Sequence, residues 1–271
     1  MKSPGISLLT FNIGNPSSER AQRQLAWLAS RDEQVLVLTE TKASAGCKLL
    51  ADAFTGAGYT VCFPQPGPGE YGTMIVTRVT ATPDPFSDAI GYLAARAAAV
   101  VLPTPEGPLR VIGLYVPSRD ASPEKTERKR RWLACCDTAL TNTAGTLTVL
   151  LGDLNILEPG HKPRYPFFAP FEYDFYRALA GTHGLTDAFR GLHPDAAEYS
   201  WVGRTGDGYR YDHAFCSREL ARRVVSCQYV HQPRTDKLSD HSALTLHLDL
   251  AAPKALDVSD PAAADEPDTL F

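Results

Sequence analysis

The sequence lacks the features that mark several large classes of protein. No apolar run approaches the roughly 20 residues that a membrane-spanning helix needs. The first residues lead directly into an apolar segment, without the longer apolar stretch and small-residue cleavage site of a signal peptide. We therefore expect a cytoplasmic protein without a membrane partner, and we expect it to be a monomer.

Paired metal-binding cysteines and an excess of basic residues are also missing. The six cysteines of the 271-residue chain show no Cys-x-x-Cys spacing, and several lie in apolar segments, which favours reduced thiols that pack as small hydrophobic groups. The formal net charge is -4, whereas nucleic-acid-binding domains commonly carry a basic excess. Any positively charged contact surface must therefore be local.

What the chain does have is the composition of an ordinary soluble globule, with 44% hydrophobic and 21% charged residues. No internal repeat or domain linker is evident, so residues 1–251 are predicted to form a single domain. Residues 252–271 are rich in Ala, Pro and acidic residues, which predicts a disordered acidic tail.

Apolar runs rich in Val, Ile, Leu and aromatic residues predict many strands and few long helices. The strands are expected at residues 6–12, 35–39, 59–63, 71–77, 96–102, 110–116, 147–152, 210–216, 224–230 and 243–249. The helices are expected at residues 17–30, 122–140 and 171–182. This ratio favours sheets that pack on each other and are covered by helices over an alternating α/β barrel.

Polar residues recur where an apolar strand ends. Asn12, Glu40 and Asp153 each follow such a run, and the strand–helix–strand order before Glu40 would bring it to the same sheet edge as Asn12. Any one of them could be a turn residue or a helix cap, but the recurrence favours a shared site. A hydrolase acting on an anionic diester needs a hard cation, which binds carboxylate and amide oxygens. Asn12 and Glu40 suit that task.

Two further patterns add polar groups to this site. Asp153 and Asn155 have period-two spacing, so both side chains would project to one side if the strand geometry continues. Asp212-His213 lies in a predicted strand, and Asp240-His241 precedes another. A histidine held by a carboxylate can act as a base or an electrophile near neutral pH. The alternative is a hydrogen-bonded core histidine, which we favour for His213 and not for His241.

These segments, in this order, resemble the endonuclease/exonuclease/phosphatase superfamily over most of residues 6–249. Its successive signature blocks are similar to Thr10-Phe11-Asn12-Ile13, Leu38-Thr39-Glu40-Thr41-Lys42, Gly152-Asp153-Leu154-Asn155, Tyr211-Asp212-His213 and Ser239-Asp240-His241. Within the superfamily the chain resembles the exonuclease III and apurinic/apyrimidinic endonuclease branch. That resemblance lies in Glu40-Thr41-Lys42, Tyr71-Gly72, Gly113-Leu114-Tyr115-Val116-Pro117, Gly184-Leu185-Thr186-Asp187-Ala188-Phe189-Arg190 and Tyr199-Ser200-Trp201.

The resemblance implies an α+β fold, a four-layered α/β/β/α sandwich of two mixed β-sheets flanked by helices, with the active site at one end. It implies a divalent-metal-dependent phosphodiester hydrolase that uses Mg²⁺ or Mn²⁺. Glu40 would hold the metal with help from Asn12, and Asp240 would support a metal position or His241.

The resemblance also assigns catalytic roles. Asp153 would orient or deprotonate the attacking water, while Asn155 and Tyr115 would contact the phosphate or the leaving oxygen. His241, oriented by Asp212, would stabilise the phosphate charge. The division between general base and electrostatic helper stays open, and a nuclease of this type would leave a 5′-phosphate and a 3′-hydroxyl.

DNA is the substrate that the branch resemblance favours, and four residues are predicted to contact it: Trp201, Arg119, Lys129 and Arg164. Lys129 lies in a basic cluster at residues 125–131 that a solvated helix face would explain almost as well, and core packing would explain Trp201 equally well. The short loop at residues 202–209 departs from abasic-site nucleases and weakens that specificity. A phosphatase or small-molecule phosphodiesterase is an alternative, as is a catalytically silent nucleic-acid-binding module.

Overall fold

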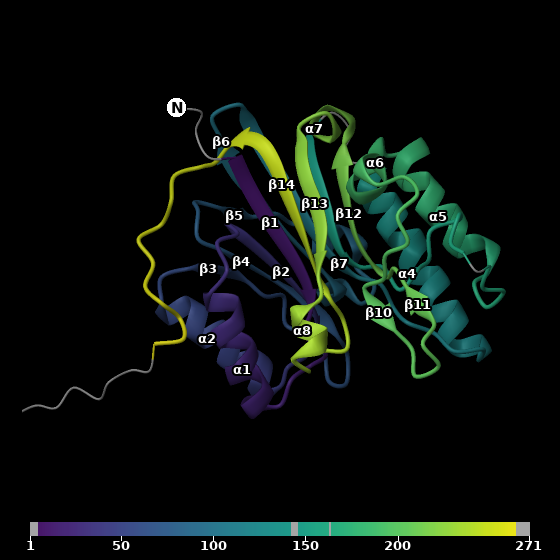
Figure 1. Ribbon diagram of the computed structural model, residues 1–271, viewed down its shortest axis with the longest axis horizontal. Coiled ribbons are helices and arrows are strands. Elements are labelled where there is room, and N and C mark those ends of the chain that lie inside the picture. Colours follow the sequence, from purple (N-terminus) through teal and green to yellow (C-terminus); the bar gives the residue numbers. More distant parts are fainter. Residues whose placement is uncertain (1–4, 142–145, 163, 264–271) are drawn as a thin grey trace, which may run out of the picture.

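Two six-stranded sheets pack face to face in the computed structural model, which describes residues 5–141, 146–162 and 164–263 (Figure 1). The first sheet has the order β13 (Val224–Val230), β14 (Ala243–Ala251), β1 (Gly5–Asn12), β2 (Val35–Thr41), β4 (Gly72–Thr77), β3 (Thr60–Cys62). The second has the order β5 (Thr82–Pro83), β6 (Ala97–Thr104), β7 (Gly107–Tyr115), β8 (Leu147–Asp153), β12 (Asp212–Ser217), β9 (Leu185–Asp187). A separate two-stranded ribbon joins β10 (Trp201–Val202) and β11 (Gly208–Tyr209).

Helices cover the outer faces of both sheets. The first sheet is covered by α1 (Ser18–Ala29) and α2 (Ala45–Gly56), and the second by α3 (Phe86–Ile90), α4 (Pro123–Thr141) and α5 (Pro170–Gly181). One apolar cluster lies between the sheets, and one lies under each helix layer. The predicted α+β sandwich of four layers is therefore confirmed. Short connecting helices are a 3-10 turn (Ala94–Arg96), α6 (Ala188–Leu192), α7 (Arg218–Ala221) and α8 (Gln232–Thr235).

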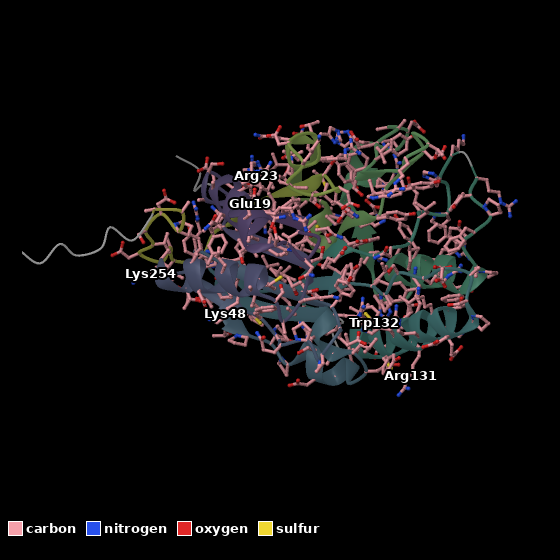
Figure 2. All side chains as sticks on the ribbon, turned by 90° about the horizontal axis from the view of Figure 1, so that it is seen from below. Glu19, Arg23, Lys48, Arg131, Trp132 and Lys254 are labelled. Carbon is pink, nitrogen blue, oxygen red and sulfur yellow. The ribbon has the colours of Figure 1, made fainter. Side chains whose placement is uncertain are left out.

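The long helices follow from the spacing of their apolar residues. In α4, Pro123 occupies the first turn, and Trp132, Leu133 and Cys136 are buried against the second sheet. Arg131 of the same helix points outward, as the labelled residues in Figure 2 show. The sequence prediction missed α2, which begins after the N-cap Ser44. Glycines within and at the end of α2 weaken its helical signal.

Each sheet contains one pair of parallel strands. Strands β1 and β2 are parallel, with Asn12 opposite Thr39, and β7 and β8 are parallel, with Tyr115 opposite Asp153. All other strand pairs of the described residues are antiparallel, so both sheets are mixed. The hydrogen bond between Asn12 at the end of β1 and Asp153 at the end of β8 places the carboxyl ends of both parallel pairs at one edge of the sandwich.

Part of the segment predicted to be a disordered tail is ordered. Residues 252–263 run from β14 towards α2 at the left of Figure 1, beside the edge of the sandwich where β3 and β5 lie. Backbone hydrogen bonds of 2.9 Å join Thr80 to Lys254, Leu256 to Arg78 and Ser259 to Ala57. Composition suggested disorder, but this backbone pairing, which composition does not reveal, corrects the prediction for these residues. Residues 264–271 lie outside the described residues.

Across the described residues, every helix is too short or too polar to cross a membrane.

Candidate active site

Asn12 joins carboxylates from the two sheets. Its Nδ2 donates to Oε2 of Glu40 at 3.0 Å and to Oδ2 of Asp153 at 2.9 Å. Its Oδ1 accepts a hydrogen bond from the backbone N–H of Gly14 at 2.9 Å, which fixes the orientation of the amide. Asn12 is fully buried, whereas Glu40 is partly exposed. Three residues predicted from separate strand ends therefore meet at one point.

Glu40 owes its position to a local irregularity in β2. It has a φ of 57°, in the left-handed region, and the register of β2 with β4 shifts between Thr39 and Thr41. Such a bulge redirects a side chain at a strand end. The backbone conformation is costly for a residue other than glycine, and strain of this kind concentrates at functional sites.

Asp153 ends β8 in a fully packed environment. The preceding residue, Gly152, has a φ of 142°, and a Cβ atom there would lie 2.0 Å from the carbonyl oxygen of Leu114. Only glycine allows this close approach of β7 and β8. Asp153 lies opposite Asp212 in the pairing of β8 with β12. Burial and the negative charge of Asp212 raise the pKa of Asp153 well above its usual range.

His241 is held by Asp212 as predicted. Its Nδ1 lies 2.7 Å from Oδ2 of Asp212, and both residues are buried. Burial alone would lower the pKa of His241, but the Asp212 charge and hydrogen bond, with a further contribution from Asp153, raise it well above its usual range. This raised pKa favours the protonated imidazole, with the carboxylates of Asp212 and Asp153 beside it. By contrast, His213 is fully buried with Nε2 3.1 Å from the carbonyl oxygen of Ile156, as expected for a core histidine.

The donors at this edge fit a hard divalent cation. Asp153, Asp212 and His241 each offer a ligand atom within 4.8 Å of the others. Among the described residues, the buried Oδ1 of Asp212 has no hydrogen-bond partner. Carboxylate oxygens suit Mg²⁺ or Mn²⁺, whereas a protonated histidine cannot ligate a metal. The carboxylates of Glu40, Asp153 and Asp212 are therefore the more suitable donors than His241.

The structure modifies the geometry expected for Asn155 beside Asp153, and the role of Tyr115 stays a prediction. β8 ends at Asp153, and Asn155 has a φ of 47°, so the condition for period-two alternation is not met. Instead, the backbone N–H of Asn155 donates to Oδ1 of Asp153 at 2.8 Å, and its Nδ2 donates to the carbonyl of Val116 at 3.0 Å. Tyr115 is buried, and burial with the charges of Glu40 and Asp153 raises the pKa of its hydroxyl well above the usual range.

Asp240 does not join the group of facing carboxylates. It is exposed, and its Oδ2 accepts a hydrogen bond of 2.9 Å from the indole Nε1 of Trp201. Trp201 also forms an antiparallel bridge with His241, so it borders the site directly. Its ring centroid lies 5.7 Å from that of Tyr209 and 6.0 Å from that of Tyr211. These three rings, Trp201, Tyr209 and Tyr211, form an aromatic wall beside the site.

Two of the three basic residues predicted to bind substrate face inward. Lys129 is 1% exposed, lies 2.7 Å from Oε1 of Glu172, and donates to the carbonyl oxygen of Asn155 at 2.6 Å. Arg119 donates through Nη2 to Oε2 of Glu172 at 2.7 Å. The side chain of Lys129 is thus enclosed by the fold, which corrects the prediction that it contacts substrate. Arg164 is exposed.

Sequence reasoning missed several residues that hold the site in place. The hydroxyl of Ser239 donates to the carbonyl of Asn12 at 2.6 Å, and that of Ser200 accepts from the backbone N–H of Asp212 at 3.1 Å. Tyr229 donates to the carbonyl of Asp212. The two serines flank predicted site residues in Tyr-Ser-Trp and Ser-Asp-His, a signal that could have drawn attention to them. Glu172 gave no comparable signal.

A sandwich of two mixed sheets with facing carboxylates at one edge is the architecture of a class of metal-dependent hydrolases. The chain belongs to the endonuclease/exonuclease/phosphatase family, whose model matches residues 9–241. No curated protein sequence matches it. The predictions of this family and of an enzyme are therefore confirmed.

Solved structures similar to this chain include nucleases and a phosphatase. An AP endonuclease from Archaeoglobus fulgidus has a TM-score of 0.76 at 24% identity, and the match covers 90% of this chain and 99% of the endonuclease chain. The 3′-5′ exonuclease NExo from Neisseria meningitidis has a TM-score of 0.74 at 25% identity, with 90% and 100% covered. A 3′ phosphatase NExo variant from Neisseria, bound to product DNA hairpin, has a TM-score of 0.75 at 24% identity, with 90% and 99% covered. These similarities show that the chain has the same fold as these enzymes.

Proposed function

We propose that this chain hydrolyses phosphodiester bonds in DNA with the help of a divalent cation, as an exonuclease III or abasic-site endonuclease does. The observation that carries the proposal is the meeting of Glu40 and Asp153 at Asn12, beside the Asp212–His241 pair. Burying carboxylates next to one another costs free energy, and a catalytically silent binding module does not require such an arrangement.

The carboxylate of Glu40 would hold the cation, and Asn12 would fix the position of that carboxylate through its hydrogen bond. When bound, Mg²⁺ or Mn²⁺ would neutralise charge on the phosphate and polarise it for attack. Asp240 would contribute only if its hydrogen bond with Trp201 opened. The choice between one and two cations is left to metal titration.

The chain's own residues divide the remaining work. Asp153 would take the proton of the attacking water, because its raised pKa gives it the proton affinity that a general base needs near neutral pH. His241 would remain protonated and donate through Nε2 to a phosphate oxygen, since Nδ1 is held by Asp212. Tyr115, kept neutral by its raised pKa, would donate its hydroxyl to the phosphate or the leaving oxygen.

Two observations support DNA as the substrate. The similar NExo structure is bound to product DNA hairpin. The aromatic wall borders His241 and offers flat faces on which bases or sugars stack, and the exposed Arg164 would contact a phosphate nearby. The net charge of -4 means that such contacts would be few and local.

The proposal is tested by incubating the purified chain with abasic, nicked and intact duplex DNA, with RNA, and with phosphoinositides. Each substrate is tried with Mg²⁺, with Mn²⁺ and with EDTA. We expect metal-dependent cutting of DNA that leaves a 5′-phosphate and a 3′-hydroxyl. Hydrolysis of a soluble phosphate ester without cutting of DNA would overturn the substrate, and metal-independent binding without any hydrolysis would favour the silent module.

A DNA 3′-phosphatase is a second candidate, because a similar structure is that of a 3′ phosphatase. A nicked duplex with a 3′-phosphate at the nick distinguishes the two activities. Release of inorganic phosphate with the strand length unchanged would indicate the phosphatase, and stepwise shortening would indicate the exonuclease.

A further inference from the structure

A cluster of buried charges lies between α4, α5 and the loop after β7. The buried cluster consists of Arg119, Lys129 and Glu172, whose side chains are 6%, 1% and 0% exposed. Buried ion pairs contribute little net stability, because the cost of removing charges from water offsets their attraction. The role of the buried cluster must therefore be sought in its contacts with the rest of the molecule.

Lys129 connects the cluster to the catalytic carboxylate. Its Nζ donates to the carbonyl oxygen of Asn155 at 2.6 Å, and the N–H of Asn155 donates to Oδ1 of Asp153 at 2.8 Å. Asn155 is further held by its side-chain bond of 3.0 Å to Val116, and its φ of 47° is one that few residues adopt without such support. A displacement of Asn155 would therefore move the N–H that orients Asp153.

Arg119 connects the same cluster to a different region. Its Nη2 donates to the carbonyl of Phe167 at 2.7 Å, and its guanidinium lies 4.3 Å from the centre of the Phe167 ring. Phe168 lies 6.3 Å from Tyr211 of the aromatic wall, measured between ring centroids. The two cations share Glu172, and Lys129 also lies 5.6 Å from the centre of the Phe168 ring. Their backbone hydrogen bonds differ, because Lys129 donates to Asn155 of the catalytic loop and Arg119 donates to Phe167 of the loop beside the aromatic wall.

We propose that Lys129 is a positioning residue that acts through the Asn155 carbonyl to hold Asp153 in place for hydrolysis. This inference rests on the proposed function and deepens it, because it separates the support of the reacting group from the support of the substrate surface. Misplacement of a catalytic group by about 1 Å can cost about 10²-fold in rate. Loss of Lys129 should therefore lower kcat, and loss of Arg119 should raise KM.

The test compares three variants that carry the same substitution to methionine. K129M removes the donor to Asn155 but leaves Arg119 paired with Glu172, and R119M removes the contact with Phe167 but leaves Lys129 in place. K254M is the control, because Lys254 is exposed on the C-terminal segment, far from α4 in Figure 2. On a DNA duplex with Mg²⁺ we expect K129M to lower kcat about 10- to 100-fold with KM changed less than about threefold. R119M should change mainly KM, and K254M neither.

Stability is measured on the same proteins by urea unfolding. A purely structural role predicts that K129M and R119M lose kcat in proportion to their loss of stability, and that result would overturn the inference, as would a normal kcat in K129M. If K129M does not fold, K129R keeps a cation for Glu172 but places its donors differently. It should recover folding while kcat stays reduced, and a fully restored kcat would contradict the role.

Amide hydrogen exchange gives a reading that does not depend on activity. K129M should speed exchange at Leu154, Asn155 and Ile156, whereas R119M should not. If the unmodified chain hydrolyses no phosphodiester, the proposed function fails. The exchange rates then decide separately whether Lys129 holds this loop, and unchanged exchange in K129M would reject that as well.

Discussion

Two groups of buried carboxylates lie around strand β12, and they differ in how much positive charge lies near them. Asp153 and Asp212 face each other with His241 as the nearest cation, and the pKa of Asp153 is raised. Asp187, opposite Phe215 of β12, lies 2.7 Å from Arg210, whose guanidinium also reaches a second carboxylate.

That second carboxylate, Glu158, is fully compensated. Its oxygens accept hydrogen bonds of 2.6 Å from Nε and Nη2 of Arg190 and one of 2.8 Å from Nη2 of Arg210. Burial would raise the pKa of Glu158, but these arginines lower it to about 2. The comparison teaches that burial of acids alone does not mark a catalytic centre. The deficit of positive charge at Asp153 and Asp212 supports the proposal that the catalytic centre lies there, because a bound cation or a proton must balance their negative charge.

The largest effect is expected when the uncompensated carboxylate is removed. D153N keeps the shape of the side chain but cannot accept a proton, so kcat should fall about 10³-fold or more. The free energy of unfolding should be unchanged or higher, because a carboxylate next to Asp212 is lost. Rates and urea unfolding of the same preparation check both parts. A near-normal rate in D153N, or in H241A, would remove this site from consideration.

The compensated group should respond in the opposite sense. R210M leaves Asp187 without its closest cation and deprives Glu158 of one, so the free energy of unfolding should fall by about 3–5 kcal/mol. Urea unfolding measures the loss. R218M, at an exposed arginine just after the same strand, is the matched control and should change stability by less than about 0.5 kcal/mol. Equal losses in both variants would show that the compensation does not matter.

A smaller change is expected from altering the balance at the histidine. In D212N the carboxylate that raises the pKa of His241 is gone while burial, which lowers it, remains. The pKa of His241 should therefore fall, with Asp153 and Asp240 still raising it, and a larger fraction of the imidazole should be neutral at pH 7. We expect kcat at pH 7 to fall about 10²-fold. Lowering the pH should not restore it, because the proposed base Asp153 becomes protonated. An imidazole NMR titration with an unchanged pKa would contradict this.

The smallest effect concerns acid stability at the compensated group. The pKa of Glu158 is about 2 in the folded protein and about 4.3 in an unfolded chain. Its folded pKa is depressed, so its stabilising contribution is present above about pH 4.3 and is lost as the pH falls towards 2. Urea midpoints measured from pH 6 to pH 3 should decline less steeply in E158Q. Parallel slopes for E158Q and the unmodified chain would mean that Glu158 does not contribute.

Much of the fold could be predicted because apolar residues recur with a fixed spacing within strands and within helices. The run from Val224 to Val230 is a strand over the predicted bounds, and the helices at α1, α4 and α5 lie within a residue or two of expectation. The helix α2 was missed because its glycines interrupt the pattern that its capping Ser44 begins. Backbone pairing of residues 254–256 with 78–80 was beyond prediction, since no side-chain pattern specifies it.

For the candidate site, the sequence predicted which residues belong to it better than it predicted the contacts between them. Strand ends identified Asn12, Glu40 and Asp153, because parallel strands bring their carboxyl ends to one edge. The partners of Lys129 were not predictable, since Glu172 lies 43 residues away and a lysine in a basic helix usually faces water. Burial, which depends on how α4 and α5 pack, determines whether such a lysine meets substrate or supports the site.

The position of β1 between β14 and β2 has a consequence for the synthesis of the protein. Residues 13–242 separate β1 from β14, and the Asn12 carbonyl accepts its hydrogen bond from Ser239 near the other end of that interval. At translation rates of about 5–20 residues per second, roughly 10 to 50 s pass between the synthesis of β1 and that of β14. His241 arrives only then. Until then, a nascent chain lacks the complete set of residues of the proposed hydrolytic centre.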